Sequence, residues 1–350
     1  VHTCVSEICS VNVRCMRTAT LKWPRGRERT YMTIKLHDMT QVMQDTTRRG
    51  VGSSRWQRPV YKHFLPPCNH ACPAGEDIQG WLAHAQAGDY EKAWYALTEN
   101  NPMPAVHGRA CYHPCEGGCN RGSLDDAVSI HAVERFLGDL AVQNGWRFQS
   151  APSTGKKVLI IGSGPAGLSC AYHLARLGHQ VEIREAAAEP GGMMMHGIPA
   201  YRLPRQPLKD EIARITSMPG VTLRCGVRVD DISQARQQGG FDAVFVAVGA
   251  QLANHLNIPA TDGKKLVDAV SLLDDVSKGE KPQLGRSVAT VGGGNVAMDA
   301  ARTAERLGAK DTVLIFRYDP KHMEALPSEA DAAFAEGVKI EWLSVADHFG

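Results

Sequence analysis

A strand, a glycine-rich loop and a helix follow one another near the middle of the chain, and this order constrains the fold more than any other feature. Residues 158–161 are a short apolar run, residues 162–167 match G-x-G-x-x-G, and residues 168–177 have a helical apolar pattern. The run is too short for a helix and predicts a buried parallel strand, so the loop predicts a dinucleotide site at the helix N-terminus. The residues predicted to line this site are Gly162, Ser163, Gly164, Pro165, Ala166 and Gly167.

An acidic residue supports this interpretation. A second predicted strand over residues 181–183 leads to Glu185, whose carboxylate can accept hydrogen bonds from ribose hydroxyls. The alternative is a glycine-rich turn without a ligand, which leaves Glu185 unexplained. Cys170 and Cys225 are interpreted as small packing residues.

The same pattern returns later in the chain. Residues 287–291 predict another short strand, and a helix is expected over residues 297–307. The next strand, predicted over residues 313–316, ends at Arg317 where an NAD site commonly has an acid, which favours a 2′-phosphate and therefore NADPH. The alternative for Arg317 is a solvated surface charge. The loop between strand and helix reads G-x-G-x-x-A, and the residues predicted to bind are Gly292, Gly294, Asn295, Val296 and Ala297.

Half of the ten cysteines lie between residues 68 and 119. Two helical patterns, the first capped by Asp77, lie between the two cysteine groups and predict a hairpin that returns the chain and brings the groups together. Iron–sulfur ligation is favoured, while zinc and ordinary packing of small buried residues remain open. The nearby histidines His63, His70, His107 and His113 are not proposed as ligands. The candidate ligands are Cys68, Cys72, Cys111, Cys115 and Cys119.

Composition is that of an ordinary globular protein, with 43% hydrophobic and 22% charged residues. Residues 1–65 hold 12 of the 39 Lys and Arg but 4 of the 37 Asp and Glu, so the remainder is mildly acidic, which argues against a nucleic-acid partner. No run is apolar enough to span a membrane, and the few cysteines predict a reducing, cytoplasmic compartment. An over-extended start is expected, with Met32 as the true beginning; a transit peptide is the alternative.

Two nucleotide sites on one chain predict one resident cofactor and one that visits, with a hydride passed between them. No acid–base dyad is required or found. The sequence contains no C-x-x-C, which argues against a dithiol reductase of the thioredoxin reductase type.

Six segments between residues 66 and 350 carry a resemblance to a known family: PPCNHACPAGEDIQGWL, NPMPAVHGRACYHPCEGGCNR, VLIIGSGPAGLSCAYHLARLGH, EPGGMMMHGIPAYRLP, FVAVGA and VATVGGGNVAMDAARTAERLGA. Over these residues the chain resembles the small (beta) subunit of NADPH-dependent glutamate synthase and its relatives, including the N-terminal part of dihydropyrimidine dehydrogenase. This resemblance implies FAD at the first loop, Glu185 and Gly192, NADPH at the second loop and Arg317, and a 4Fe–4S cluster on the five cysteines. The implied partner is the large glutamate synthase subunit, where glutamine and 2-oxoglutarate become glutamate.

Several features depart from the family pattern. Residues 50–67 lack the additional cysteine pair of relatives with two clusters, and His107 stands where many relatives have a cysteine. Glu134 lies near a position from which some relatives ligate a cluster, but we expect it to be an exposed helix charge. The chain stops at Gly350, before the C-terminal segment that resumes the FAD fold in the family.

We therefore expect an α/β protein with two nested Rossmann-like domains behind a small α-helical iron–sulfur domain. The expected function is electron input, from NADPH to FAD to a cluster and then to a partner subunit. The alternatives are an NADPH:ferredoxin-type oxidoreductase that serves another terminal enzyme, or a truncated, non-catalytic binding module. The expected segments are a basic arm over 1–65, the iron–sulfur domain over 66–150, the FAD domain over 151–255 and the NAD(P)H domain over 256–350.

Overall fold

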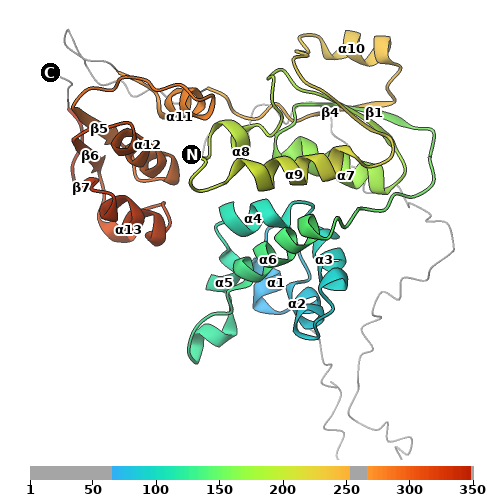
Figure 1. Ribbon diagram of the computed structural model, residues 1–350, viewed down its shortest axis with the longest axis horizontal. Coiled ribbons are helices and arrows are strands. Elements are labelled where there is room, and N and C mark those ends of the chain that lie inside the picture. The colour runs from blue at the N-terminus through green and yellow to red at the C-terminus, as the bar shows by residue number, and fades with distance from the viewer. Residues whose placement is uncertain (1–64, 253–265, 348–350) are drawn as a thin grey trace, which may run out of the picture. The chain divides into compact units, whose positions relative to one another are not determined.

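The structure is a computed structural model that describes residues 65–252 and 266–347. The basic arm, apart from Leu65, and the alternative start at Met32 lie outside the described residues. Among the described residues, no helix has both the length and the apolar character needed to cross a membrane. Figure 1 shows a helical region followed by two regions built on β-sheets.

The helical region packs around a small apolar core that includes Trp81, Leu97 and Leu137. Asp77 caps α2 by accepting a hydrogen bond from the Gly80 N–H, as the sequence predicts, and α2 pairs with α3 as a hairpin. At the crossing of α4 and α6, a Cβ on Gly138 would collide with the backbone of α4, so the glycine allows the two helices to touch. The elements are α1 (Pro67–Ala71), α2 (Ile78–Gln86), α3 (Tyr90–Thr98), α4 (Pro104–Ala110), α5 (Pro114–Gly117), the 3-10 helix η1 (Asn120–Ser123) and α6 (Ile130–Gln143).

The first sheet is parallel, with the strand order β3-β2-β1-β4. Helices α7 and α9 lie between this sheet and the helical region in Figure 1. The Tyr172 hydroxyl on α7 donates a hydrogen bond to the Thr98 carbonyl at the end of α3, and this contact joins the two regions. The elements are β1 (Lys157–Ile161), α7 (Pro165–Arg176), β2 (Gln180–Arg184), α8 (Met193–His196), α9 (Arg205–Thr216), β3 (Val221–Arg224), α10 (Ile232–Gly239) and β4 (Ala243–Val246).

The second sheet is also parallel, with the order β5-β6-β7. Its core joins α12 and α13 to the sheet through Met298, Leu314, Phe316 and Ala333. The α/β class with two Rossmann-like sheets behind a helical domain is confirmed. The elements are α11 (Ala269–Ser277), β5 (Ser287–Val291), α12 (Asn295–Arg306), β6 (Asp311–Phe316), η2 (Pro320–His322), α13 (Pro327–Ala335) and β7 (Lys339–Trp342).

Candidate functional site

The first glycine-rich loop connects β1 to α7 by a turn that other residues cannot make. Gly162 has φ +101°, and a Cβ there would collide with the Ala247 carbonyl. A Cβ on Gly167 would collide with the Gly162 carbonyl, so α7 can pack this closely only with glycine at that position.

Gly164 differs from its neighbours because space lies in front of it. The nearest atom that a Cβ there would meet is the Cα of Gly192, at 4.0 Å. Pro165 and Ala166, in the first turn of α7, are exposed. An exposed helix N-terminus with open space before it fits a pyrophosphate, which backbone N–H groups and the helix dipole stabilise.

Ser163 and Glu185 brace this loop from inside. The Ser163 N–H and hydroxyl donate to Glu185 Oε2 at 2.7 and 2.6 Å, and the Ala187 N–H donates to Oε1 at 2.9 Å. Burial raises the pKa of Glu185, but these donors outweigh it and leave the pKa below its ordinary value. Glu185 therefore stays ionised beside the loop, and its predicted hydrogen bond to ribose stays a prediction.

Gly192 reaches the same loop from another part of the chain. The Gly191 N–H donates to the Ser163 carbonyl at 3.1 Å and to Ser163 Oγ at 3.2 Å. Gly192 has φ +53°, and a Cβ added at this position would lie 2.8 Å from the Cα of Gly164. The structure thus brings Gly192 beside the first loop.

The second loop repeats this arrangement between β5 and α12. Gly292 has φ +141°, and a Cβ on Gly293 would collide with the Phe316 ring. A Cβ on Gly294 would meet nothing closer than Glu324 Oε2, at 3.8 Å, so the space before α12 is open here too. The motif G-x-G-x-x-A allows any residue at position 293, but the packing against Phe316 requires glycine there.

Three further predicted residues lie at the start of α12 and after β6. Val296 is exposed in the first turn of α12, whereas Asn295 accepts a hydrogen bond from the Leu326 N–H at 3.1 Å and so holds α12 against α13. Arg317 is exposed, with its guanidinium 4.8 Å from the centre of the Tyr318 ring. That position leaves its charge accessible to a nucleotide phosphate.

The hairpin brings the two cysteine groups together, as predicted. Helix α1 packs against α5, and Cys68, Cys72 and Cys115 belong to one apolar cluster. Cys68 and Cys119 line one open pocket of about 410 Å³. All cysteines in the described residues are free, so these five thiols are available as ligands, and the donor set fits an iron–sulfur cluster.

The thiols differ in how readily they ionise. Burial raises the pKa of Cys115 to about 12 and also raises that of Cys111. Backbone N–H groups at Val128 and Arg121 lower the pKa of Cys119. Since metals bind the thiolate, cluster binding must displace protons from the buried thiols.

The expectation that Glu134 is an exposed helix charge is wrong. The residue is 6% exposed, and Asn101 Nδ2 donates to it at 2.5 Å and to Glu76 at 2.9 Å. Burial raises the pKa of both carboxyls, that of Glu134 well above its ordinary value. The spacing in the sequence could have indicated that Glu134 is buried, because it shares one face of α6 with the buried residues Ile130, Leu137 and Ala141.

His107 also belongs to this buried polar group. Its Nδ1 lies 2.6 Å from Asn101 Oδ1, and burial lowers its pKa to about 4, which keeps the ring neutral. Asn101 therefore links His107, Glu76 and Glu134, and sequence reasoning missed its role. His113 and His131 stack nearby, and the Glu116 carboxylate, 2.7 Å from His131 Nδ1, ties the cysteine loop to α6.

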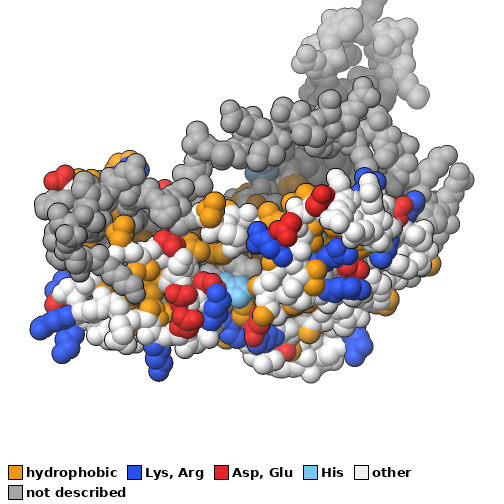
Figure 2. Space-filling model, turned by 90° about the horizontal axis from the view of Figure 1, so that it is seen from above, with side chains coloured by type: hydrophobic (Ala, Val, Ile, Leu, Met, Phe, Trp, Pro, Cys, Tyr) orange, Lys and Arg blue, Asp and Glu red, His pale blue; other side chains and the backbone are white. Residues whose placement is uncertain are grey.

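Charged side chains are mixed over the face shown in Figure 2, where Lys and Arg alternate with Asp and Glu. Many pair locally, as Lys156 does with Asp242 at 2.8 Å. Such pairs are individually weak and mark a solvated surface.

Comparison with known proteins shows two family matches. Residues 156–348 match the pyridine nucleotide-disulphide oxidoreductase family. Residues 59–146 match the family described as dihydropyrimidine dehydrogenase domain II, 4Fe-4S cluster. Of the predicted cofactors FAD, NADPH and a 4Fe–4S cluster, these matches confirm FAD, a pyridine nucleotide and the cluster. The assignment of the individual cysteines as ligands stays a prediction.

Individual relatives share this organisation. The chain is 39% identical over 312 residues to the NADP(+)-dependent formate dehydrogenase subunit beta of Moorella thermoacetica, and this alignment covers 81% of the chain and 44% of the relative. It is 38% identical over 287 residues to the NADPH-Fe(3+) oxidoreductase subunit beta of Geobacter sulfurreducens, and that alignment covers 80% of the chain and 43% of the relative. The chain thus spans less than half the length of these two relatives.

A third relative is matched over more of its length. The chain is 35% identical over 280 residues to the NAD-dependent dihydropyrimidine dehydrogenase subunit PreT of Salmonella typhimurium, covering 78% of this chain and 67% of that protein. The chain belongs to the pyridine nucleotide-disulphide oxidoreductase family and carries, ahead of its nucleotide-binding sheets, a 4Fe–4S domain of the dihydropyrimidine dehydrogenase type.

Proposed function

We propose that the chain is the electron-input part of an oxidoreductase, which takes electrons from NADPH and delivers them to a partner protein. The observation that carries this proposal is the presence in one chain of two open glycine loops, each before a helix N-terminus, and of free cysteines of which Cys68, Cys72 and Cys115 share one cluster. FAD bound at the first loop would take a hydride, that is two electrons and one proton, from NADPH, which would leave as NADP+, and it could release the two electrons one at a time to the cluster.

The chain's own residues bind and orient these groups. Glu185 and Ser163 hold the first loop in shape, and Gly164 leaves room for the pyrophosphate of FAD. Gly294 leaves the corresponding room for NADPH. The proposed cluster ligands come from Cys68, Cys72, Cys111, Cys115 and Cys119; one 4Fe–4S cluster takes four thiolates and leaves one of these five over.

Arg317 is proposed to select NADPH over NADH. Two of the relatives are named for NADP or NADPH and one for NAD, so the family name alone does not decide the nucleotide. An exposed guanidinium at the end of β6 suits the 2′-phosphate, because Arg donates two parallel hydrogen bonds to such an anion.

The R317A variant is expected to raise the KM for NADPH by about 10- to 100-fold and to leave the KM for NADH almost unchanged. A charge-assisted hydrogen bond is worth about 1.5–3 kcal/mol, and only NADPH offers the phosphate. Steady-state dye reduction with each nucleotide measures the effect. R228A is the control, since Arg228 is an exposed surface residue paired with Asp230. An equal rise for both nucleotides would contradict the assignment.

The names of the relatives indicate what kind of partner accepts the electrons. Formate dehydrogenase and Fe(3+) oxidoreductase appear in the names of the relatives, whose matched chains are beta subunits. These names support a separate partner subunit as electron acceptor. The large glutamate synthase subunit stays a prediction, as does a cytoplasmic location, and an NADPH:ferredoxin-type activity is the alternative. Identification of the subunit that copurifies with the full-length protein discriminates among the partners.

Anaerobic titration of the full-length holoprotein with NADPH tests the proposal. The flavin absorbance is expected to bleach, and the reduced cluster is expected to give a paramagnetic resonance signal. A bound flavin that is indifferent to both NADPH and NADH would refute the reductase function and favour the non-catalytic binding module.

A further inference from the structure

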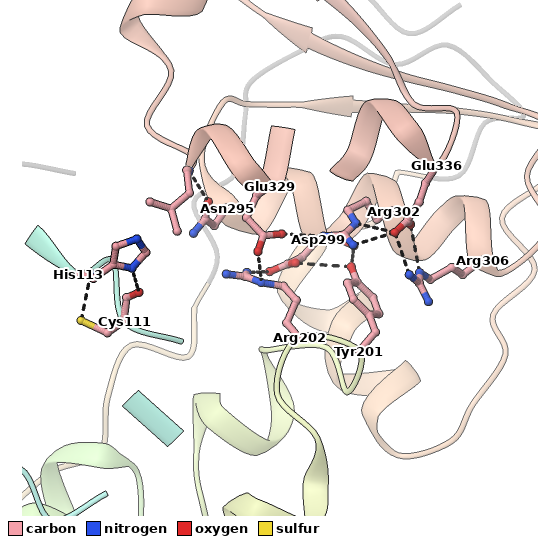
Figure 3. A network of polar contacts seen from close by, with 11 residues as sticks. Cys111, His113, Tyr201, Arg202, Asn295, Asp299, Arg302, Arg306, Glu329 and Glu336 are labelled. Atoms are coloured by element: carbon pink, nitrogen blue, oxygen red, sulfur yellow. Dashed lines mark hydrogen bonds and ion pairs between the residues drawn. The ribbon is translucent and has the colours of Figure 1, made fainter. Parts of the chain in front are cut away.

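The loop that follows α8 in the first sheet region contacts α12, the helix that begins at the second glycine loop (Figure 3). Arg202, which follows α8, places Nη1 2.7 Å from Asp299 Oδ2 on α12 and Nε 3.0 Å from Glu329 Oε1 on α13. The side chains of Arg202 and Asp299 are only 11% and 5% exposed. This is a buried ion pair between the two nucleotide-binding regions.

Tyr201 extends the same contact. Its hydroxyl lies 3.4 Å from the Asp299 carbonyl, and its ring lies 4.6 and 4.0 Å from the guanidinium carbons of Arg302 and Arg306. Arg302 in turn binds Glu329 at 2.6 Å. Helices α12 and α13 therefore surround the Tyr201–Arg202 segment with a cradle of charged side chains, two of which lie over the Tyr201 ring.

The charges in this cradle balance only when Arg202 is seated. Arg202, Arg302 and Arg306 face three carboxylates, those of Asp299, Glu329 and Glu336. A buried charge that loses its partner is strongly unfavourable, and displacement of Arg202 would take from Asp299 its hydrogen-bonded cationic partner. The contact thus favours one arrangement of the two regions over nearby ones.

Its position connects it to both loops. Asp299 lies one helical turn after Asn295, which begins α12 directly behind the second glycine loop. On the other side, the chain runs back from Tyr201 through α8 to Gly191, whose N–H is bonded to Ser163 in the first loop. His196 on α8 adds a second contact, with Nδ1 3.0 Å from Asp274 of α11.

We propose that Arg202 is a positioning residue, which through Asp299 fixes the NAD(P)H-binding loop relative to the FAD-binding loop. This inference rests on the proposed hydride transfer, which requires the reacting atoms to approach to about 3–3.5 Å. Misplacement by about 1 Å costs roughly 100-fold in rate, so a rigid contact between the regions controls the rate without touching either nucleotide.

Anaerobic stopped-flow reduction of the flavin by NADPH in the full-length holoprotein tests this role. R202M is expected to lower the limiting rate by about 10- to 100-fold. The NADPH concentration for half the limiting rate and the equilibrium affinity for NADP+ are expected to stay within about threefold of wild type, because the nucleotide contacts are intact. R228M is the control, since Arg228 is an exposed arginine that pairs with Asp230 and not with Asp299 or Glu329 in the described residues.

The R202M/D299N double variant separates positioning from stability. It removes both buried charges, so thermal stability is expected to recover while the limiting rate stays low; R202K is expected to restore part of the rate. A wild-type rate in R202M, or a rate that recovers with stability in the double variant, would overturn the role of Arg202. If the wild-type flavin is not reduced by NADPH at all, the proposed function fails first, and the positioning role with it.

Discussion

The G164V variant is expected to fold like the wild type and to lose affinity for FAD by about 100-fold or more. Apart from its chain neighbours, the nearest atom to a Cβ at this position is the Gly192 Cα at 4.0 Å, and φ is −69°, so a Cβ fits there without backbone strain. The added side chain fills the space through which the pyrophosphate approaches the N–H groups of α7. Charge-assisted hydrogen bonds are worth about 1.5–3 kcal/mol each, and losing two of them gives a loss of this size. Flavin content after purification and FAD titration of the apoprotein measure it.

The equivalent glycine of the second loop provides the matched control. G294V is expected to retain FAD and to lose binding of NADP+, because the open space before α12 is then filled instead. Each variant should therefore lose one nucleotide and keep the other. Loss of both nucleotides from either variant would show a general folding defect and contradict the assignment of separate sites.

The strand–loop–helix units were predictable because their signals are local. The strand over residues 287–291 agrees with β5 (Ser287–Val291), and Glu185 directly follows β2 as expected. Both helices begin earlier than predicted, α7 at Pro165 and α12 at Asn295. The reason is that loop residues already adopt helical conformation immediately after Gly164 and Gly294, where the apolar pattern has not yet begun.

Contacts between distant segments were not predictable. Glu134 is a charged residue on the buried stripe of α6, and it accepts a hydrogen bond from the Asn101 amide, which lies 33 residues away in the sequence. The pairing of Arg202 with Asp299 spans 97 residues and joins two regions with no shared local pattern. Burial of a charge depends on a partner that the linear pattern does not reveal.

The C115S variant is expected to abolish the 4Fe–4S cluster. Cys115 is the most buried of the five candidate ligands, and it lies with Cys68 and Cys72 in the apolar cluster where α1 meets α5. A serine hydroxyl at that position is a poor ligand for iron. Another cysteine of the chain cannot take the place of Cys115, because its side chain would have to enter a buried position. Iron and acid-labile sulfide are expected to fall to background, with loss of stability because cluster binding contributes to folding.

Cys170 supplies the control for this variant, because it is a partly buried thiol on α7 that packs beside the core of the first sheet. Burial raises the pKa of Cys170 to about 11, so it stays a neutral thiol. C170S is expected to keep full iron and sulfide content and to cost only a small loss of stability. Retention of a complete cluster in C115S would exclude Cys115 as a ligand and leave the other four cysteines as the full set. Loss of iron from C115S together with retention of flavin and NADP+ would place the cluster in the helical region and both nucleotides on the sheets.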